Sequence, residues 1–226
     1  MNKRIIVFAP HPDDETLGCG GTIAKRLKEG YEVMVVFLTD GSQAFSGVLG
    51  IDTDPSPERL REIRRDEVRR AMRMLNVKEE NLLFLDFEDE SLEKNEEKAK
   101  DKVMEILNKN QPSEVYFPYE KDSHPDHRAT NHIVRNSIKK LRLSVKCYRY
   151  SIMQKYGRVG PLIDAFLNLF RHDMIHRDIS EFLPIKKMAI KEFESELLII
   201  SSKQKKPVLR KVEKLLRNKE VFYIDK

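Results

Sequence analysis

Two short clusters of histidine and acidic residues have the composition of a hydrolytic metal site. The first cluster, HPDDE, spans residues 11–15, and the second, HPDH, spans residues 124–127. A catalytic zinc ion takes three protein ligands and leaves one position for water, and imidazole with carboxylate suits zinc or another divalent transition metal such as iron or cobalt. Such a metal lowers the pKa of its water to around 7 and polarises a carbonyl oxygen. The two clusters therefore predict metal-assisted hydrolysis.

The spacing within the clusters indicates which side chains hold the metal. His11 and Asp14 are three residues apart, and Pro12 restricts the turn between them, so both side chains can point at one centre. His127 from the second cluster would complete a set of two imidazoles and one carboxylate. We therefore predict His11, Asp14 and His127 as the metal ligands.

The remaining side chains of the clusters fit the other roles that amide hydrolysis needs. Asp13, beside the ligand Asp14, could take a proton from the attacking water and later give it to the leaving amine. His124, if protonated, could stabilise the oxyanion opposite the metal. Asp126 could hold the orientation of His124, as carboxylates commonly do for histidine.

Each cluster also has an ordinary structural explanation. Acidic residues before a helix are favoured by the helix dipole, Pro-Asp is a common opening of a turn, and a lone loop histidine is usually a polar surface residue. The position of the clusters favours a site, because each directly follows a predicted strand.

The elements that must position the clusters follow from apolar runs and helical periodicity. Predicted strands cover residues 4–9, 33–38, 82–85, 115–118 and 145–150. Predicted helices run through Leu27 and over residues 57–76, 95–110, 127–141 and 183–200. Strands that alternate with helices imply an α/β fold, here a Rossmann-like three-layer sandwich with a mostly parallel sheet and helices on both faces. In such sheets the site lies beyond the carboxyl ends of the strands, where both clusters fall.

Three other segments lack this regular alternation. Residues 39–57 are rich in glycine, serine, aspartate and proline, so we predict a long loop, and long loops are often functional lids. The stretch at 152–177 contains an apolar run that predicts a packed or partner-facing helix, so a homo-oligomer is possible. The run VFYI at 221–224 predicts an edge strand.

The length of 226 residues and the absence of an obvious linker predict one domain over residues 1–226, with a basic C-terminal segment at 201–226. The net charge is +5, and eight lysines or arginines lie between positions 201 and 219 against a single acid, Glu213. A solvated helix face explains this run better than nucleic-acid binding, and it leaves membrane association open.

The two cysteines and the N-terminus bear on the compartment. Cys19 and Cys147 are far apart and belong to no paired motif, which argues against a disulfide framework and fits a reducing environment. The apolar run near the N-terminus is too short for a signal-peptide core or a membrane span. We therefore expect a cytoplasmic protein.

The two clusters resemble the motifs of the PIG-L/LmbE-like family of zinc-dependent N-acetylglucosamine deacetylases. The first match is APHPDDE at 9–15, continued by TLGCGG at 16–21, and the second is HPDH at 124–127. Pro10 departs from the family pattern, in which alanine usually stands directly before the histidine. Weaker matches are TDG at 39–41, IRRDE at 63–67 with LNV at 75–77, FLD at 84–86 with Asp89, and DIS at 178–180 with Lys187, Ala189 and Ser195. Glu196 stands where the family commonly has glutamine.

The resemblance implies an activity and a role for each matching residue. The activity is hydrolysis of the N-acetyl group of a small amino-sugar substrate that contains N-acetylglucosamine. The implied roles are metal ligand for His11, Asp14 and His127, general base for Asp13, and charge stabiliser for His124 with Asp126 behind it. The resemblance also implies that Arg64 contacts a phosphate or hydroxyl of the substrate and that Asp89 contacts sugar hydroxyls. The ordinary alternatives for these two are a helix-surface ion pair with Glu67 and a loop acid.

Two other functions stay open from the sequence. A related amidase could cleave a different glucosaminyl amide, and the pocket around the 39–57 loop would decide between the substrates. A non-enzymatic protein could instead bind an anion, a lipid or a nucleic acid through the basic segment, and salt-sensitive binding without hydrolysis would favour it. The complete set of ligands, base and stabiliser counts against the binding protein.

Overall fold

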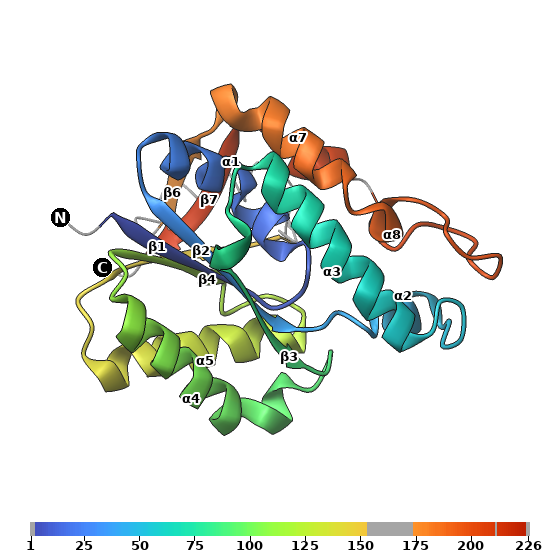
Figure 1. The fold of residues 1–226 in the computed structure, drawn as a ribbon, viewed down its shortest axis with the longest axis horizontal. Helices are drawn as coiled ribbons and strands as arrows, with labels where there is room; N and C mark the ends of the chain where they lie inside the picture. Colours follow the sequence, from blue (N-terminus) through green and yellow to red (C-terminus); the bar gives the residue numbers. More distant parts are fainter. Residues whose placement is uncertain (1–2, 153–173, 211, 225–226) are drawn as a thin grey trace, which may run out of the picture.

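A seven-stranded sheet forms the centre of the molecule in a computed structural model that describes residues 3–152, 174–210 and 212–224 (Figure 1). The strand order is β3-β2-β1-β4-β5-β7-β6. The first five strands pair in parallel, and β7 runs antiparallel to both of its neighbours. The strands are β1 (Arg4–Ala9), β2 (Glu32–Thr39), β3 (Leu82–Phe87), β4 (Glu114–Pro118), β5 (Lys146–Tyr150), β6 (Met174–Asp178) and β7 (Lys219–Ile224).

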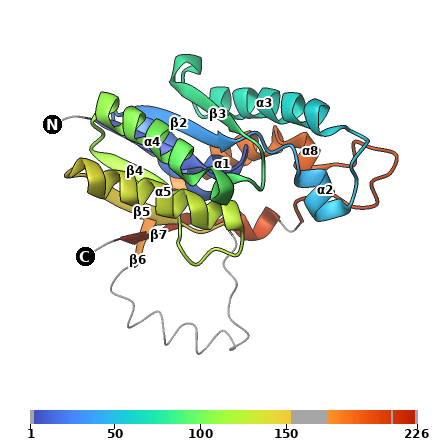
Figure 2. The ribbon, with the colours of Figure 1, turned by 90° about the horizontal axis from the view of Figure 1, so that it is seen from below.

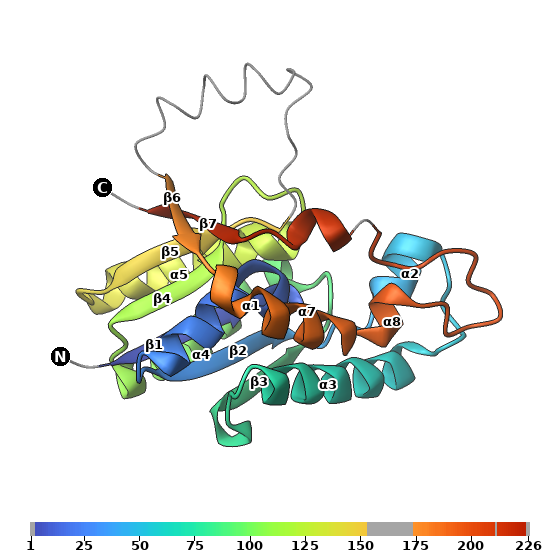
Figure 3. The same cartoon turned by 90° about the horizontal axis from the view of Figure 1, so that it is seen from above.

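Helices cover both faces of the sheet and confirm the predicted α/β sandwich. The helices are α1 (Asp14–Lys28), α2 (Ala44–Leu49), α3 (Pro57–Met74), α4 (Glu96–Asn110), α5 (Pro125–Leu141), α7 (Leu183–Lys191) and α8 (Glu194–Leu197). Helices α1, α3 and α7 contribute to the apolar core on one face, and α4 and α5 to the core on the other. Figures 2 and 3 show the two layers from opposite sides.

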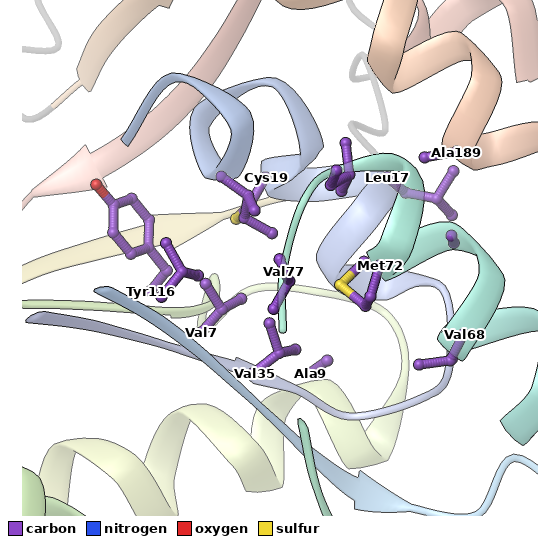
Figure 4. Packing of buried hydrophobic residues seen from close by; sticks show 14 of the residues in the cluster. Val7, Ala9, Leu17, Cys19, Val35, Val68, Met72, Val77, Tyr116 and Ala189 are labelled. Carbon is purple, nitrogen blue, oxygen red and sulfur yellow. The ribbon is translucent and has the colours of Figure 1, made fainter. Parts of the chain in front are cut away.

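The central strand β1 explains why the two cores form. Its side chains alternate between the faces, so Ile5, Val7 and Ala9 enter one core while Ile6 and Phe8 enter the other. All five are fully buried, as expected for a continuous apolar run in a parallel sheet covered on both faces. Figure 4 shows the first of these cores, where Val7 and Ala9 lie near Val35 and side chains of α1 and α3. The strand is therefore held rigidly at the point where the first cluster begins.

Close packing of α1 requires glycine at one position in particular. A Cβ atom on Gly21 would lie 2.5 Å from Cδ1 of Ile179, which is fully buried. No side chain fits in that space. The GCGG sequence therefore allows α1 to approach the C-terminal part of the chain closely.

The structure corrects three of the sequence-based element predictions. The predicted 39–57 loop contains the short helix α2. The predicted 183–200 helix is interrupted after Lys191, because the chain turns to bury Phe193 in the core, and α8 is a separate helical turn. The run at 221–224 belongs to β7, which lies between β5 and β6 and is not an edge strand.

Only the two ends of the predicted helix over 152–177 fall in the described residues. Residues 174–177 belong to strand β6, which is the edge strand next to β7, and residues 153–173 lie outside the described residues. None of the helices in the described ranges has the length and apolar character that crossing a bilayer requires.

Candidate metal centre and active site

The two motif clusters meet at the carboxyl ends of β1 and β4. The first cluster continues β1 and leads into α1, whose first turn contains Asp14 and Glu15. The second cluster follows β4 and starts α5, where His124 is the N-cap residue and its Nδ1 accepts a hydrogen bond of 3.2 Å from the amide of Asp126. Strands β1 and β4 are parallel neighbours in the sheet, and a helix follows each of them at the same edge. The N-termini of α1 and α5 therefore place the two clusters face to face.

Three side-chain atoms converge on one point between the clusters. His11 Nδ1 lies 3.1 Å from Asp14 Oδ2, His127 Nε2 lies 3.2 Å from the same oxygen, and the two nitrogens are 3.3 Å apart. Ligand atoms at 2.0–2.1 Å from a tetrahedral zinc ion are about 3.3 Å from one another. The three predicted ligands therefore form an almost equilateral triangle of the size that a divalent metal requires.

His11 also faces a second group of acids through its other ring nitrogen. Its Nε2 lies 3.1 Å from Asp89 Oδ1 and 3.3 Å from Asp126 Oδ2, which makes these three residues another possible metal set. Backbone amides already occupy both of these carboxylates. Asp126 accepts hydrogen bonds from the amides of Glu90 and Leu92, and Asp89 accepts from Gln43 and Glu90. Asp14 Oδ2 likewise accepts the amide of His11 at 2.9 Å, so backbone contacts do not distinguish the two sides. We favour the Nδ1 side of His11 as the metal side because a second imidazole, His127, meets Asp14 there.

The grouping of His11, His124 and His127 is a third possibility. Potential ligand atoms of these three histidines lie within 4.8 Å of one another. The ring of His124 stands edge-on to that of His11, with centroids 4.5 Å apart. Two histidines with one carboxylate are a common set for catalytic zinc, and Asp14 Oδ2 lies 3.1 Å from His11 Nδ1 and 3.2 Å from His127 Nε2. His124 is therefore better described as a neighbour of the ligand triangle.

Charge within the triangle matches metal binding. Burial raises the pKa of Asp14, but the positive charge of His127 and the hydrogen bond from His11 outweigh burial and hold that pKa well below its ordinary value. Burial lowers the pKa of His127, but the charge of Asp14 and the contacts with Asp122 and Asp14 raise it to about 9. In the metal-free protein the histidines carry the positive charge that a metal ion would replace.

Asp122 is a member of the site that the sequence analysis missed. Its Oδ2 lies 3.2 Å from Nδ1 of His127, although the two atoms miss hydrogen-bond alignment, and its Oδ1 accepts the amide of His124. A carboxylate on the far nitrogen of a metal-binding histidine fixes the ring and raises its basicity. The available signal was an aspartate two residues before the HPDH motif, in the same strand-exit loop.

Asp13 occupies a strained and buried position beside the triangle. Its φ of 139° lies in the region that favours glycine, and the residue is only 8% exposed. Such strain concentrates at functional sites, where the surrounding structure holds it in place. Burial raises the pKa of its carboxyl well above the ordinary value, against the lowering effect of Arg64. The carboxyl is therefore a stronger proton acceptor than an ordinary aspartate.

Arg64 is buried behind Asp13 and is not a surface residue. Its guanidinium donates to the carbonyl oxygens of Pro12 at 2.7 Å and of Gly41 at 3.1 Å. It also lies 3.1 Å from Glu196 and 3.5 Å from Asp13. These contacts connect the β1 and β2 exit loops to α8. The alternative of a surface ion pair between Arg64 and Glu67 is wrong, because Arg64 is only 3% exposed.

The family comparison decides the relationship that these motifs suggest. Residues 6–138 match the PIG-L family, described as GlcNAc-PI de-N-acetylase, which is more than half of the chain. The chain belongs to the PIG-L family. The resemblance drawn from the motifs is therefore confirmed, and the match includes both clusters.

Individual members of the PIG-L family agree with this assignment. The diacetylchitobiose deacetylase of Thermococcus kodakarensis is 35% identical over 131 residues, which covers 56% of this chain and 45% of that enzyme. A probable N-acetyl-α-D-glucosaminyl L-malate deacetylase of Bacillus subtilis is 26% identical over 97% of this chain and 91% of that protein. The solved structure of N,N'-diacetylchitobiose deacetylase from Pyrococcus horikoshii superposes with a TM-score of 0.71 at 26% identity, over 99% of this chain and 84% of that one.

Two further buried acids complete this PIG-L site. Glu15 is fully buried, accepts the amide of Asp13, and has its pKa raised by burial to about 7. Glu196, at the position where the family commonly has glutamine, faces Arg64 from α8. The sequence suggested Glu15 only as part of the motif, and nothing in the periodicity of α8 indicated that Glu196 reaches the site.

Proposed function

We propose that this chain is a zinc-dependent hydrolase that removes the N-acetyl group from a substrate containing N-acetylglucosamine. The observation that carries the proposal is the triangle of His11 Nδ1, Asp14 Oδ2 and His127 Nε2, with Asp13 and His124 beside it. The deacetylase names of the PIG-L relatives support the choice of substrate class. The match to the Thermococcus enzyme spans less than half of that protein, so its activity is carried over only as part of this proposal.

The three triangle residues would hold the metal, and the remaining chemistry falls to their neighbours. When bound, a zinc ion supplies a more acidic water and polarises the carbonyl oxygen of the acetamide. The reaction adds water to the carbonyl carbon and breaks the bond between carbon and nitrogen, which gives acetate and a free amine. The enzyme must therefore remove one proton from the water and deliver one to the amine.

Asp13 is the group we propose for both proton transfers. The carboxyl is held beside Asp14 but is not part of the triangle, and its raised pKa allows it to accept the proton of the attacking water. The same carboxylic acid then protonates the leaving amine. Arg64 donates to the carbonyl oxygens of Pro12 and Gly41 and lies 3.5 Å from Asp13. We propose that it positions Asp13 and acts on the substrate through that carboxyl.

His124 is the group we propose for stabilising the oxyanion. Its Nδ1 accepts the amide hydrogen of Asp126, so a neutral ring carries its proton on Nε2 and can donate it in a hydrogen bond. Burial and the positive charges of His11 and His127 lower the pKa of His124, which favours this neutral form. The proposal therefore differs from the first expectation of a protonated His124.

Asp126 and Asp89 support the site from the Nε2 side of His11. The carboxylate of Asp126 accepts the amides of Glu90 and Leu92 and so positions the loop that carries Asp89, while the contact with His124 runs through its backbone amide. Asp89 is buried, and His11 outweighs the effect of burial and lowers the pKa of its carboxyl. An ionised Asp89 suits acceptance of hydrogen bonds from sugar hydroxyls.

Metal removal tests the proposal directly. We expect a chelator to abolish release of free amine from N-acetylglucosamine or diacetylchitobiose, and added zinc to restore it. His127→Ala should bind little zinc and should not be rescued at the same zinc concentration. Turnover that is indifferent to chelation would contradict metal catalysis, and failure of the zinc-loaded protein to release any amine would contradict the deacetylase.

A further inference from the structure

Asp40 is a buried acid at the exit of β2, outside the ligand triangle and the groups proposed for proton transfer. Its side chain is only 1% exposed. The residue contacts the chain on both sides of the turn that follows β3. Its amide donates to the carbonyl oxygen of Phe87 at 2.9 Å, and its Oδ1 accepts the amide of Asp89 at 3.2 Å. Asp40 therefore extends the pairing of β2 with β3 beyond the end of β3, as far as Asp89.

The turn that carries Asp89 needs support from outside, because its backbone is strained. Glu90, directly after Asp89, has a φ of 63°, in the left-handed region that favours glycine. Other residue types persist there only where the surrounding structure holds them. Asp126 holds the amide of Glu90, and Asp40 holds the amide of Asp89 itself. The position of the Asp89 carboxylate therefore depends on Asp40.

Arg61 of α3 fixes the orientation of the Asp40 carboxylate. Its Nε and Nη2 lie 2.9 and 2.8 Å from Oδ2 of Asp40. The other oxygen, Oδ1, accepts the amide of Ser42 as well as that of Asp89. Hydrogen bonds between charged partners are stronger than those to a neutral amide. The guanidinium therefore clamps one oxygen while the other holds the two backbone segments.

The contacts of Asp89 leave one acceptor position on its carboxylate. Each carboxylate oxygen can accept about two hydrogen bonds. Oδ1 accepts the amide of Glu90 and faces Nε2 of His11. Among the described residues, Oδ2 accepts only the amide of Gln43. Asp89 can therefore accept one further hydrogen bond, through Oδ2, which limits its contact with a sugar to one hydroxyl.

We propose that Asp40 is a positioning residue for the sugar: it holds Asp89 where Oδ2 accepts one ring hydroxyl of the N-acetylglucosamine unit, and Arg61 keeps Asp40 in place. The inference rests on the proposed deacetylase function and names the groups behind one of its substrate contacts. The hydroxyl takes no part in the bond changes, so its contact is similar in the ground state and the transition state. Loss of the contact should therefore raise KM more than it lowers kcat.

A deoxy-sugar series with the full-length, zinc-loaded protein tests the proposal. The methyl glycoside of N-acetylglucosamine is compared with its 3-deoxy, 4-deoxy and 6-deoxy analogues by amine release. We expect Asp40→Asn to raise KM for the parent glycoside about tenfold, as for loss of a hydrogen bond to a charged group, with kcat within about threefold. For one deoxy analogue, the one without the hydroxyl that Asp89 accepts, wild type and variant should have the same KM.

A second variant keeps the Asp40 carboxylate and removes only its clamp. Arg61→Gln should show the same dependence on one hydroxyl at a smaller size, about threefold in KM. The Arg61 side chain is 48% exposed, so the protein should fold normally, and this variant decides if Asp40→Asn does not fold. Arg59→Gln is the matched control, because Arg59 lies on the same helix, is exposed, and pairs with Glu62 instead. It should leave KM unchanged for all four glycosides.

The outcomes separate this inference from the proposed function. An effect of Asp40→Asn that is equal for all four glycosides, a loss of kcat in place of the rise in KM, or equal kinetics of Arg61→Gln and Arg59→Gln would overturn the positioning role while the deacetylase stands. No amine release by the wild type from any of the glycosides or from diacetylchitobiose would overturn the deacetylase and the inference with it.

Discussion

Two buried clusters of charged side chains lie along helix α1, and they differ in the hydrogen-bond partners of their polar atoms. Near its N-terminus lie His11, Asp14 and His127. Farther along, Lys186 of α7 donates to Glu220 of β7 at 2.6 Å and to the carbonyl oxygen of Leu17 at 2.8 Å.

In the Lys186–Glu220 cluster the two charged groups are paired with each other and with the backbone of α1. Both oxygens of Glu220 accept backbone amides of α1, from Gly21 and Thr22, and one of them also accepts the lysine. In the first cluster, by contrast, three atoms that can all ligate a metal crowd one point beside a strained Asp13. Buried charge alone therefore does not indicate a site. Convergence of metal-ligating atoms does, and the following predictions test that distinction.

The largest effect is expected for Asp13→Asn. The change keeps the size of the side chain but removes the proposed base, so kcat should fall about a hundred- to ten-thousandfold. Zinc content should be unchanged, because Asp13 is not part of the triangle. Amine-release kinetics and metal analysis measure the two quantities, with Asp101→Asn on the exposed side of α4 as control. Near-wild-type turnover would remove Asp13 from its role.

Lys186→Met should act on stability instead of turnover. It leaves the buried Glu220 without its counter-charge, so the free energy of unfolding should fall by about 3–5 kcal/mol. Chemical denaturation measures the loss. Adding Glu220→Gln to Lys186→Met removes the unpaired carboxylate and should recover part of the lost free energy of unfolding. If Lys186→Met alone unfolded like the wild type but lost zinc, the Lys186–Glu220 cluster would belong to the metal site and the contrast between the two clusters would be wrong.

Asp122→Asn should weaken the metal site without destroying it. The aspartate lies behind His127, and loss of such a partner typically costs about ten- to a hundredfold in metal affinity. Competition with a chromogenic chelator measures the affinity, and Asp101→Asn again serves as control. Equal affinities for the two variants would mean that Asp122 does not support His127.

The smallest effect is a pH dependence of metal binding. The pKa of His127 is raised to about 9 in the metal-free protein, so its ring is protonated at neutral pH and zinc must displace that proton. Apparent zinc affinity should therefore rise with pH up to about 9 and fall as the pH is lowered. Burial lowers the pKa of His11, but Asp89 and the hydrogen bonds to Asp126 and Asp14 hold it well above its ordinary value, so this ring is protonated as well. Calorimetry in two buffers of different ionisation enthalpy should therefore detect about two released protons per zinc at pH 7.5, one from each histidine. A pH-independent affinity would contradict this charge state.

The parts of the fold that could be predicted are those with a local signal. Residues 5–9 form a continuous apolar run, and both motif clusters directly follow such runs, so the parallel sheet and the position of the site were accessible. Strands β6 and β7 pair across a long stretch of chain, and periodicity contains no information about that pairing.

The predicted site was incomplete for a related reason. Asp122 is close to the HPDH motif in the chain, but nothing in the residue type shows that its side chain turns back toward His127. Glu196 reaches the site only because a distant segment folds against it, and a charged residue in an isolated helical turn looks like a surface residue. The same holds for Lys186 and Glu220, whose burial depends on α1 approaching through its glycines. Local patterns identify ligands within a motif but not the partners that tertiary packing supplies.

Anomalous X-ray scattering at the zinc edge, from crystals of the zinc-loaded protein, tests the central claim most directly. The account predicts one strong peak about 2.0–2.2 Å from His11 Nδ1, Asp14 Oδ2 and His127 Nε2. A peak bound instead by His11 Nε2, Asp89 and Asp126, or no peak within the histidine cluster, would contradict it.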